Sequence, residues 1–339
     1  MTSDDLLRHH GDVDAAPGLV DFAVNVRGGR PPAWLRDRLA SALDRVGAYP
    51  SAADDLRARE AVAGRHGCEP DEVLILNGSA EGFSLLPNLR SRKAAVVHPS
   101  FTEPEVALRA GGIPVHRVLL DQADGFVLHP ERVPADADLV VIGNPTNPTS
   151  VLHPGERIRE LARGRTVLVD EAFMDAIPGE PETLAGADGI LVFRSLTKMW
   201  ALPGLRAGYA VGPPDLLTRL AHNRPQWPVG TLVLEAVVAC CEAPALAESE
   251  VAALDAQAHR EALRAELAEF VIGDPRAPFL LLEIPDGERV RLALRERGIA
   301  VRRGDTFPGL GKDHLRVAVR SPRECLPLVA ALRELEVRP

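Results

Sequence analysis

Short apolar runs alternate with amphipathic stretches over most of the first two thirds of the chain. Between about Ser51 and Gly212, each run has the pattern of a strand, and helical periodicity follows most of them. The predicted strands begin at Val73, Ala94, Ile113, Leu139, Thr166, Ile190 and Gly208. Near-continuous apolar strands are typical of parallel sheets that helices cover on both faces. The pattern therefore predicts an α/β fold with a large, mostly parallel central sheet.

After residue 242 the chain shows a long helical pattern followed by a second group of strands. Residues Ala243 to Phe270 are rich in Ala, Glu, Arg and Leu with helical periodicity, and Gly273 and Pro275 end the stretch, which predicts a long connecting helix. Three further strands separated by helices are expected at Phe279–Glu283, Ile299–Val301 and Leu315–Val319. These predict a smaller α+β domain. The expected division is 1–45 for an N-terminal segment that joins the small domain, 46–228 for the large domain, and 229–339 for the linking helix and the small domain.

Composition narrows the class of protein. The chain has 339 residues, of which 46% are hydrophobic, so it can bury a large core. A net charge of −9 argues against a nucleic-acid partner. No apolar run is long enough to span a membrane and the N-terminus is polar, so we expect a cytoplasmic protein. Four cysteines and ten histidines show no metal-binding spacing, and no metal is expected.

One lysine stands among hydroxyl groups and an arginine between two predicted strands. Within a dozen residues the chain carries Ser195, Thr197, Lys198 and Arg206. An amine can hold a cofactor aldehyde as a Schiff base, while hydroxyls and a guanidinium bind its phosphate. The segment therefore favours pyridoxal phosphate, with Lys198 on a loop that faces a cleft. The alternative is an ordinary solvated loop.

Two more polar residues follow predicted strands. Asp170 ends the run that begins at Thr166, where a carboxylate can pair with the pyridine nitrogen and keep it protonated. Asn147 follows the strand at Leu139 in a loop stiffened by two Asn-Pro pairs, where its amide can donate to the ring oxygen. Taken alone, Asp170 is also compatible with a helix cap, and the Asn147 segment with a plain rigid loop.

A third strand end has the features of an anion site. The strand at Val73 leads into a glycine turn, then Ser79 and Ala80, and then a helical pattern. Free backbone N–H groups at such a helix start attract phosphate. Taken alone, a serine in this place is more often a helix N-cap, and the two roles can coexist.

These motifs, in this order, resemble the fold-type I pyridoxal-phosphate enzymes of the aspartate aminotransferase superfamily over nearly the whole chain. The resemblance implies that Lys198 holds the cofactor, that Asp170 and Asn147 contact its ring, and that Phe101 stacks on the ring face. It implies phosphate contacts from Ser79, Ala80, Ser195 and Arg206.

Several segments are similar to the branch that contains histidinol-phosphate aminotransferase and threonine-phosphate decarboxylase. Ala48-Tyr49-Pro50 resembles the segment whose tyrosine reaches the partner's cofactor phosphate in a homodimer. The substrate in this branch is a small phosphorylated amino compound. The positions that match its substrate-binding residues are His10, Asn25, Arg303 and Arg316, with Arg302 as the alternative to Arg303.

Some positions depart from the family pattern. Phe173 stands where many aminotransferases have tyrosine, Ser150 replaces a glycine, and Arg27-Gly28-Gly29 replaces an Asn-Pro turn. The missing tyrosine hydroxyl favours the decarboxylase. Several segments also look more like the decarboxylase, among them 10–12, 170–175, 226–229 and 302–310. Our first expectation is therefore L-threonine-O-3-phosphate decarboxylation in cobalamin biosynthesis, and the alternative is aminotransfer involving histidinol phosphate. A noncatalytic protein that has kept the fold is a third hypothesis, against which Lys198 and Asp170 argue.

Overall fold

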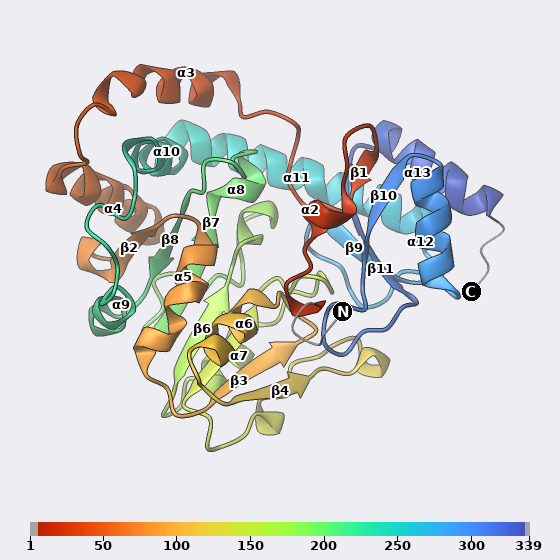
Figure 1. Ribbon diagram of the computed structural model, residues 1–339, viewed down its shortest axis with the longest axis horizontal. Coiled ribbons are helices and arrows are strands. Elements are labelled where there is room, and N and C mark those ends of the chain that lie inside the picture. The colour runs from red at the N-terminus through yellow and green to blue at the C-terminus, as the bar shows by residue number, and fades with distance from the viewer. Residues whose placement is uncertain (1–5, 336–339) are drawn as a thin grey trace.

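A seven-stranded sheet forms the larger part of the computed structural model, which describes residues 6–335 (Figure 1). Its order is β2-β8-β7-β6-β5-β3-β4, and all neighbours from β7 to β4 are parallel, whereas β8 runs antiparallel to both β2 and β7. The strands are β2 (Val73–Leu76), β3 (Ala94–His98), β4 (Val115–Leu119), β5 (Leu139–Gly143), β6 (Thr166–Asp170), β7 (Ile190–Ser195) and β8 (Gly208–Val211). The predicted fold class is confirmed, although β4 begins two residues later than expected.

Helices cover this sheet on both faces because its strands are apolar on both sides. In β5, Val140 and Ile142 pack into one core, and Leu139 and Val141 pack into another. Each large side chain buried in this way contributes roughly 1.5–3 kcal/mol to stability. The α-helices of this part are α3 (Ala33–Ser41), α4 (Ala52–His66), α5 (Ser79–Leu85), α6 (Glu103–Ala110), α7 (Gly155–Leu161), α8 (Leu196–Met199), α9 (Pro214–Leu220) and α10 (Thr231–Cys241).

Short 3-10 turns connect many of these elements. They are η1 (Leu43–Arg45), η2 (Pro70–Glu72), η3 (Leu86–Leu89), η4 (Gln122–Asp124), η5 (Pro130–Arg132) and η6 (Met174–Ala176). Of these, η6 matters most for the site, because it follows β6 and packs against the long helix described below.

A second sheet of four strands, in the order β1-β10-β11-β9, contains a strand from the N-terminal segment. β1 runs parallel to β10, while β10, β11 and β9 are antiparallel neighbours. The elements here are α2 (Gly11–Asp14), β1 (Val20–Phe22), β9 (Phe279–Glu283), α12 (Gly287–Glu296), β10 (Ile299–Arg303), β11 (His314–Ala318) and α13 (Pro322–Glu334). The exact domain boundaries stay a prediction.

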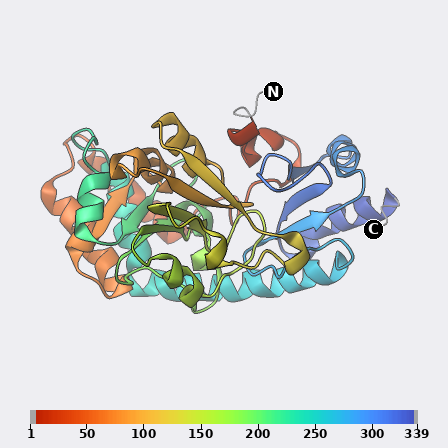
Figure 2. The same ribbon diagram turned by 90° about the horizontal axis from the view of Figure 1, so that it is seen from below.

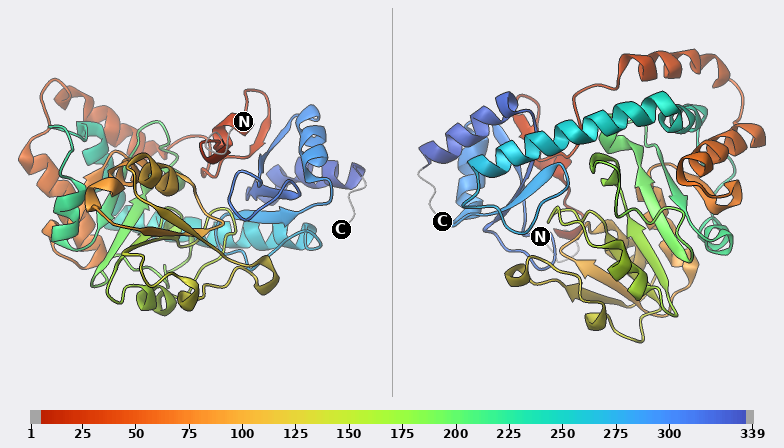
Figure 3. Two further views of the ribbon diagram at one scale, coloured as in Figure 1. Left: turned by 60° about the horizontal axis from the view of Figure 1, so that its bottom comes forward. Right: turned by 180° about the vertical axis from the view of Figure 1, so that it is seen from behind.

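One long helix, α11 (Ala243–Glu266), runs along both parts of the molecule (Figures 2 and 3). It starts at the predicted residue, with Pro244 in the first turn, where a missing backbone N–H costs nothing. It ends four residues before the predicted Phe270. Among the described residues, every helix is too short or too polar to cross a bilayer.

Candidate active site

Lys198 lies in α8, a single helical turn directly after β7, and not in the loop expected from the sequence. Its side chain is partly buried. Burial lowers the pKa of Lys198 to about 8, and the nearby charges of Arg316 and Arg206 act in the same direction. A lysine with a lowered pKa is more often neutral near pH 7, which is the state in which an amine can attack an aldehyde.

Asp170 is the last residue of β6, the strand next to β7. Its Oδ1 accepts a hydrogen bond of 3.2 Å from the backbone N–H of Ala172. Burial raises the pKa of Asp170 to about 7 in spite of the opposing effect of Lys198. A buried carboxyl group in this state is stabilised when a cationic partner arrives, so the site fits a protonated pyridine nitrogen.

The phosphate donors come together across three strand ends. Gly78 precedes α5 with φ of 78°, and a Cβ there would lie 2.9 Å from Nη2 of Arg206. A Cβ on Gly208 would lie 2.9 Å from the backbone nitrogen of Ser79. Only glycine permits these approaches. They form a cradle of backbone N–H groups and a guanidinium that fits a phosphate.

Two hydroxyls complete this cradle from α8 and the end of β7. The Oγ of Ser195 lies 2.7 Å from Oγ1 of Thr197, and both residues are buried. Ala80 follows Ser79 in the first turn of α5. The donors predicted from the sequence for the cofactor phosphate are therefore neighbours in space.

Phe101 and His10 lie together beside the start of α6. Their ring centroids are 5.1 Å apart, and Phe101 also packs on Phe83 at 5.9 Å. His10 Nε2 lies 2.6 Å from Oε1 of Glu103. This contact ties the N-terminal segment to α6 and places His10 near the predicted ring-stacking residue.

Arg316 joins the second sheet to the loop after β5. Its Nη1 donates to Oδ1 of Asn147 across 2.6 Å, and its Nη2 donates to the carbonyl of Ala23. Because Oδ1 of Asn147 accepts this bond, Nδ2 points elsewhere and can donate a hydrogen bond to the ring oxygen of a cofactor. The Nε of Arg316 is buried and has no partner among the described residues.

Asn25 lies in the same N-terminal segment and is only 7% exposed. Neither its Oδ1 nor its Nδ2 has a hydrogen-bond partner in the described part of the chain. Buried polar groups are normally paired with protein, water or ligand, so both side-chain atoms of Asn25 are available to a ligand. Asn25 and Lys198 line one cavity of about 730 Å³ between the two parts of the molecule.

Arg303 does not face this region, which corrects one sequence prediction. Arg302 is paired across the strands with Arg316, whereas Arg303 is paired with Leu315, a residue of the small-sheet core. Since successive side chains point to opposite faces, Arg302 shares the face of Arg316. Arg303 is held instead by Asp305, at 2.6 and 2.5 Å.

Arg302 is already bound within the chain. It donates to Oδ2 of Asp14 at 3.1 Å, to Oγ1 of Thr306 at 2.7 Å and to the carbonyl of His9 at 2.5 Å. The bonds to Asp14 and His9 connect β10 to α2 and to the segment before it. Its charge also helps to lower the pKa of Arg316 from its ordinary value, although burial is the larger cause.

Tyr49 lies outside the cavity that Lys198 lines. It is 74% exposed and stacks on Trp227, with ring centroids 4.2 Å apart. Together with Pro50 and Gly230, Tyr49 borders a separate open cavity of about 600 Å³. A tyrosine exposed in this way is free to contact a second copy of the chain.

Sequence reasoning missed Arg320 and Arg27. Arg320 lines the cavity, and its Nη2 donates to the carbonyls of Val24 at 2.8 Å and Asp21 at 3.1 Å. The period-two pattern that placed Arg316 also places Arg320 on the same face, so this signal was present. The backbone N–H of Arg27 donates to the carbonyl of Lys198 at 2.9 Å, which no pattern in the sequence indicates.

The fold and the lysine-centred site define a pyridoxal-phosphate enzyme, and comparison with known proteins agrees. The chain belongs to the aminotransferases of class I and II, whose family model matches residues 18–332. Pyridoxal phosphate is therefore its cofactor. When bound, this cofactor withdraws electrons from the substrate carbon next to the amino group.

Relatives of known name fall in the expected branch. A histidinol-phosphate aminotransferase of Mycobacterium tuberculosis is 54% identical over 96% of this chain and 90% of its own length. Threonine-phosphate decarboxylase of Salmonella typhimurium is 33% identical over 94% of this chain and 91% of its own. Among solved structures, histidinol-phosphate aminotransferase from Clostridium acetobutylicum superposes with a TM-score of 0.85 at 23% identity, covering 94% of this chain and 99% of that one. The resemblance to this superfamily is thus confirmed.

Proposed function

We propose that this enzyme is an aminotransferase that acts on histidinol phosphate or a closely related phosphorylated amino compound. The observation that carries the proposal is the Lys198 amine, whose pKa is lowered to about 8 by burial and by the nearby charges of Arg316 and Arg206, against the opposing effect of Asp170. The choice of reaction rests on the 54% identical aminotransferase relative, set against 33% for the decarboxylase. This reverses the order expected from the sequence, in which decarboxylation came first.

Each residue of the site has a proposed role. Lys198 binds the cofactor aldehyde and then moves the proton at the substrate carbon, which its pKa of about 8 permits near neutral pH. Asp170 pairs with the ring nitrogen, Asn147 donates to the ring oxygen, and Phe101 covers the ring face. The phosphate of the cofactor is assigned to Ser79, Ala80, Ser195, Thr197 and Arg206, and to Tyr49 of a second copy.

The substrate is assigned to Asn25, which lines the cavity, and to Arg316 and His10. Arg316 supplies a buried guanidinium whose neighbour Arg302 adds positive charge on the same face, an arrangement that suits a phosphate or carboxylate. His10 and Asn25 come from the N-terminal segment that crosses the site. Asn25 brings two unpaired polar atoms, which an amino alcohol phosphate can satisfy.

The cavity volume is compatible with a substrate as large as histidinol phosphate. A space of about 730 Å³ lies within the range of sites for drug-sized ligands and leaves room for an imidazole ring. Asp255 and Glu324, two carboxylates on its outer wall, offer acceptors for ring N–H groups. Incubation of the holoenzyme with histidinol phosphate and 2-oxoglutarate tests the proposal, because glutamate should form only when both are present.

Threonine-phosphate decarboxylation is retained as a second candidate because of Phe173. This residue lies against Lys198, with the amine 5.9 Å from the ring centroid, where a tyrosine hydroxyl would bind the cofactor oxygen. Release of carbon dioxide from threonine phosphate without any keto acid would establish this reaction instead. Its place in cobalamin biosynthesis would follow only in that case.

The homodimer and the cytoplasmic location also belong to the proposal. Tyr49 and Trp227 offer an exposed aromatic pair of the kind enriched at protein interfaces. All four cysteines are free thiols, which suits a reducing compartment.

A further inference from the structure

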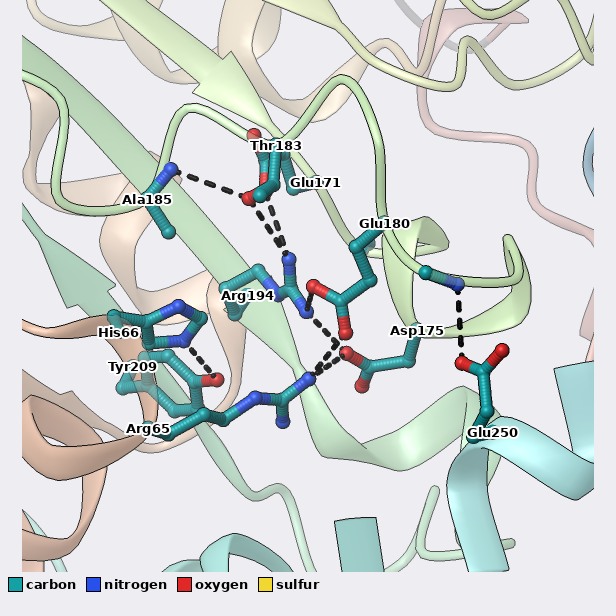
Figure 4. Close-up of polar contacts among 12 residues, drawn as sticks. Arg65, His66, Glu171, Asp175, Glu180, Thr183, Ala185, Arg194, Tyr209 and Glu250 are labelled. Carbon is teal, nitrogen blue, oxygen red and sulfur yellow. Dashed lines mark hydrogen bonds and ion pairs between the residues drawn. The ribbon is translucent and has the colours of Figure 1, made fainter. Parts of the chain in front are cut away.

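A cluster of five charged side chains, most of them buried, lies at the ends of β6 and β7 (Figure 4). This ionic cluster consists of Arg65, Glu171, Asp175, Glu180 and Arg194. Arg194 and Glu171 are at most 1% exposed, and Glu180, the most open of the acids, is 25% exposed. None of the five has a role in the chemistry proposed above.

The contacts of the ionic cluster are shared between its members. Arg194 donates to Oε2 of Glu171 at 2.8 Å, to Oε2 of Glu180 at 2.6 Å and to Oδ1 of Asp175. Arg65 donates to the same oxygen of Asp175 at 2.6 Å and to Oε1 of Glu180 at 2.7 Å. Asp175 and Glu180 therefore each bridge both guanidinium groups, so the positions of the five side chains are interdependent.

Buried ion pairs are a costly way to stabilise a protein. Removing two charges from water costs about as much as their attraction returns, and apolar side chains of similar volume often serve stability better. We therefore ask which residues the ionic cluster positions, because stability alone does not explain it.

Members of the cluster alternate along the chain with residues of the site. Asp170 precedes Glu171, Ser195 follows Arg194, and Phe173 lies between Glu171 and Asp175. Successive side chains in a strand point to opposite faces, so Glu171 and Arg194 lie on the reverse side of the strand ends from Asp170 and Ser195. Asp175, in η6, also lines the cavity that Lys198 lines. The ion pair between Glu171 and Arg194 joins the end of β6 to the end of β7, next to a backbone hydrogen bond of 2.8 Å from Glu171 to Phe193.

The same contacts fix Phe173 beside the lysine. Asp175 lies in η6, and its two arginine partners hold that turn, so that Phe173 meets Lys198 with the amine 5.9 Å from the ring centroid. The three residues Asp170, Phe173 and Ser195 thus each lie within two positions of a member of the ionic cluster.

We propose that Arg194 and its ionic cluster are the positioning device of this active site, which sets Asp170, Phe173 and Ser195 relative to Lys198. The inference rests on the pyridoxal-phosphate class of the enzyme and not on the identity of its amino substrate. The electrostatics agree with it: three carboxylates against two guanidiniums leave a net negative charge behind Asp170, and Glu171 adds to the effect of burial in raising the pKa of Asp170.

The test compares two buried arginines. Arg260 in α11 is 3% exposed, contacts Glu261 and the carbonyl of Arg276, and like Arg194 has a buried Nε without a partner among the described residues. Arg260→Met is therefore the control for the loss of a buried guanidinium, and Arg194→Met differs from it in removing the partner of three carboxylates. The measurements are thermal unfolding of the apoprotein, the dissociation constant for pyridoxal phosphate, and the pH midpoint of the visible absorption band of the holoenzyme.

Arg194→Met should weaken cofactor binding about 10-fold or more and move the midpoint of the band, because it displaces groups assigned to the cofactor. A misplacement of about 1 Å can cost about 100-fold in activity. Arg260→Met should lose stability alone, and Arg194→Lys should restore part of what Arg194→Met loses. Cofactor affinity and a midpoint equal to wild type in Arg194→Met would overturn the proposal. None of these measurements uses an amino substrate. They therefore test the positioning proposal even if the enzyme does not act on histidinol phosphate.

If Arg194→Met does not fold, a milder variant, Glu180→Gln, tests the positioning role of the ionic cluster. Glu180→Gln removes the charge of a quarter-exposed residue that bridges both arginines, and the amide occupies nearly the same volume. A shifted midpoint in Glu180→Gln supports positioning by the cluster. A wild-type midpoint together with wild-type cofactor affinity would overturn it.

Discussion

Arg316 and Asn147 are joined by a hydrogen bond of 2.6 Å between the guanidinium Nη1 and the side-chain oxygen, although 169 residues separate them in the sequence. The bond connects the second sheet to the loop that follows β5 in the large sheet. One residue is assigned to the substrate and the other to the cofactor ring, so this contact couples the two binding functions.

Replacement of Arg316 should therefore weaken the binding of substrate more than that of cofactor. Arg316→Ala leaves a substrate anion without its buried partner, which costs about 2–5 kcal/mol. Steady-state kinetics and cofactor titration measure the two effects separately. Arg303→Ala is the matched control, because Arg303 faces Asp305 and should leave the KM unchanged. An equal loss of both affinities in Arg316→Ala would show that Arg316 is a structural residue.

Lys198→Ala should abolish the visible absorption band of the bound cofactor and all turnover. The apoprotein of this variant should also be more stable than wild type near pH 7, by roughly 1–3 kcal/mol, because a buried cation with a lowered pKa is removed. Absorption spectra and chemical denaturation check the two expectations. Lys312→Ala, at an exposed lysine, should change neither quantity, and a retained band in Lys198→Ala would refute the assignment.

The stability of the apoprotein should respond to Asp170 with a defined sign. The pKa of Asp170 is raised by burial from 3.8 to about 7, so its stabilising contribution is complete below about pH 4 and is lost as the pH rises through 7. Asp170→Asn lacks this dependence. The variant should therefore gain stability relative to wild type between pH 4 and 8, by roughly 2–4 kcal/mol at the upper end. A difference that stays constant with pH would contradict the raised pKa.

The strand-end motifs were readable from the sequence because their residues are adjacent to apolar runs. Asp170, Asn147, Ser79 and Lys198 all stand at or just after a strand, and parallel strands bring such ends to one edge of a sheet. The seven strands of the large sheet were found in the same way. The order of the sheet was not, since pairing depends on contacts that no local pattern records.

Other features could not be predicted for physical reasons. The choice between Arg302 and Arg303 depends on a strand register of one residue, which reverses the face of every side chain. The ionic cluster escaped notice because Arg65 meets Asp175 across 110 positions of the chain. The helical turn at Lys198 is a single turn, too short to have a periodicity of its own.

Tyr49 offers a test of the homodimer that needs no structure of the complex. If the tyrosine acts on the partner's cofactor, Tyr49→Ala and Lys198→Ala should each be weak or inactive alone. A mixed dimer of the two variants then contains one complete site, made of Lys198 from one copy and Tyr49 from the other. Mixing under exchange conditions should restore up to about a quarter of wild-type activity, since about half of the dimers are hybrids and each has one complete site of two. No recovery, with exchange verified, would place Tyr49 outside the partner's site.

The most direct measurement is the number of turnovers per Lys198 site with and without 2-oxoglutarate, for histidinol phosphate and for threonine phosphate. An aminotransferase keeps the amino group of its first substrate until a keto acid removes it. We predict at most one turnover per site with histidinol phosphate alone and many when 2-oxoglutarate is added. Repeated release of carbon dioxide from threonine phosphate without keto acid, with no amino transfer from histidinol phosphate, would contradict the account.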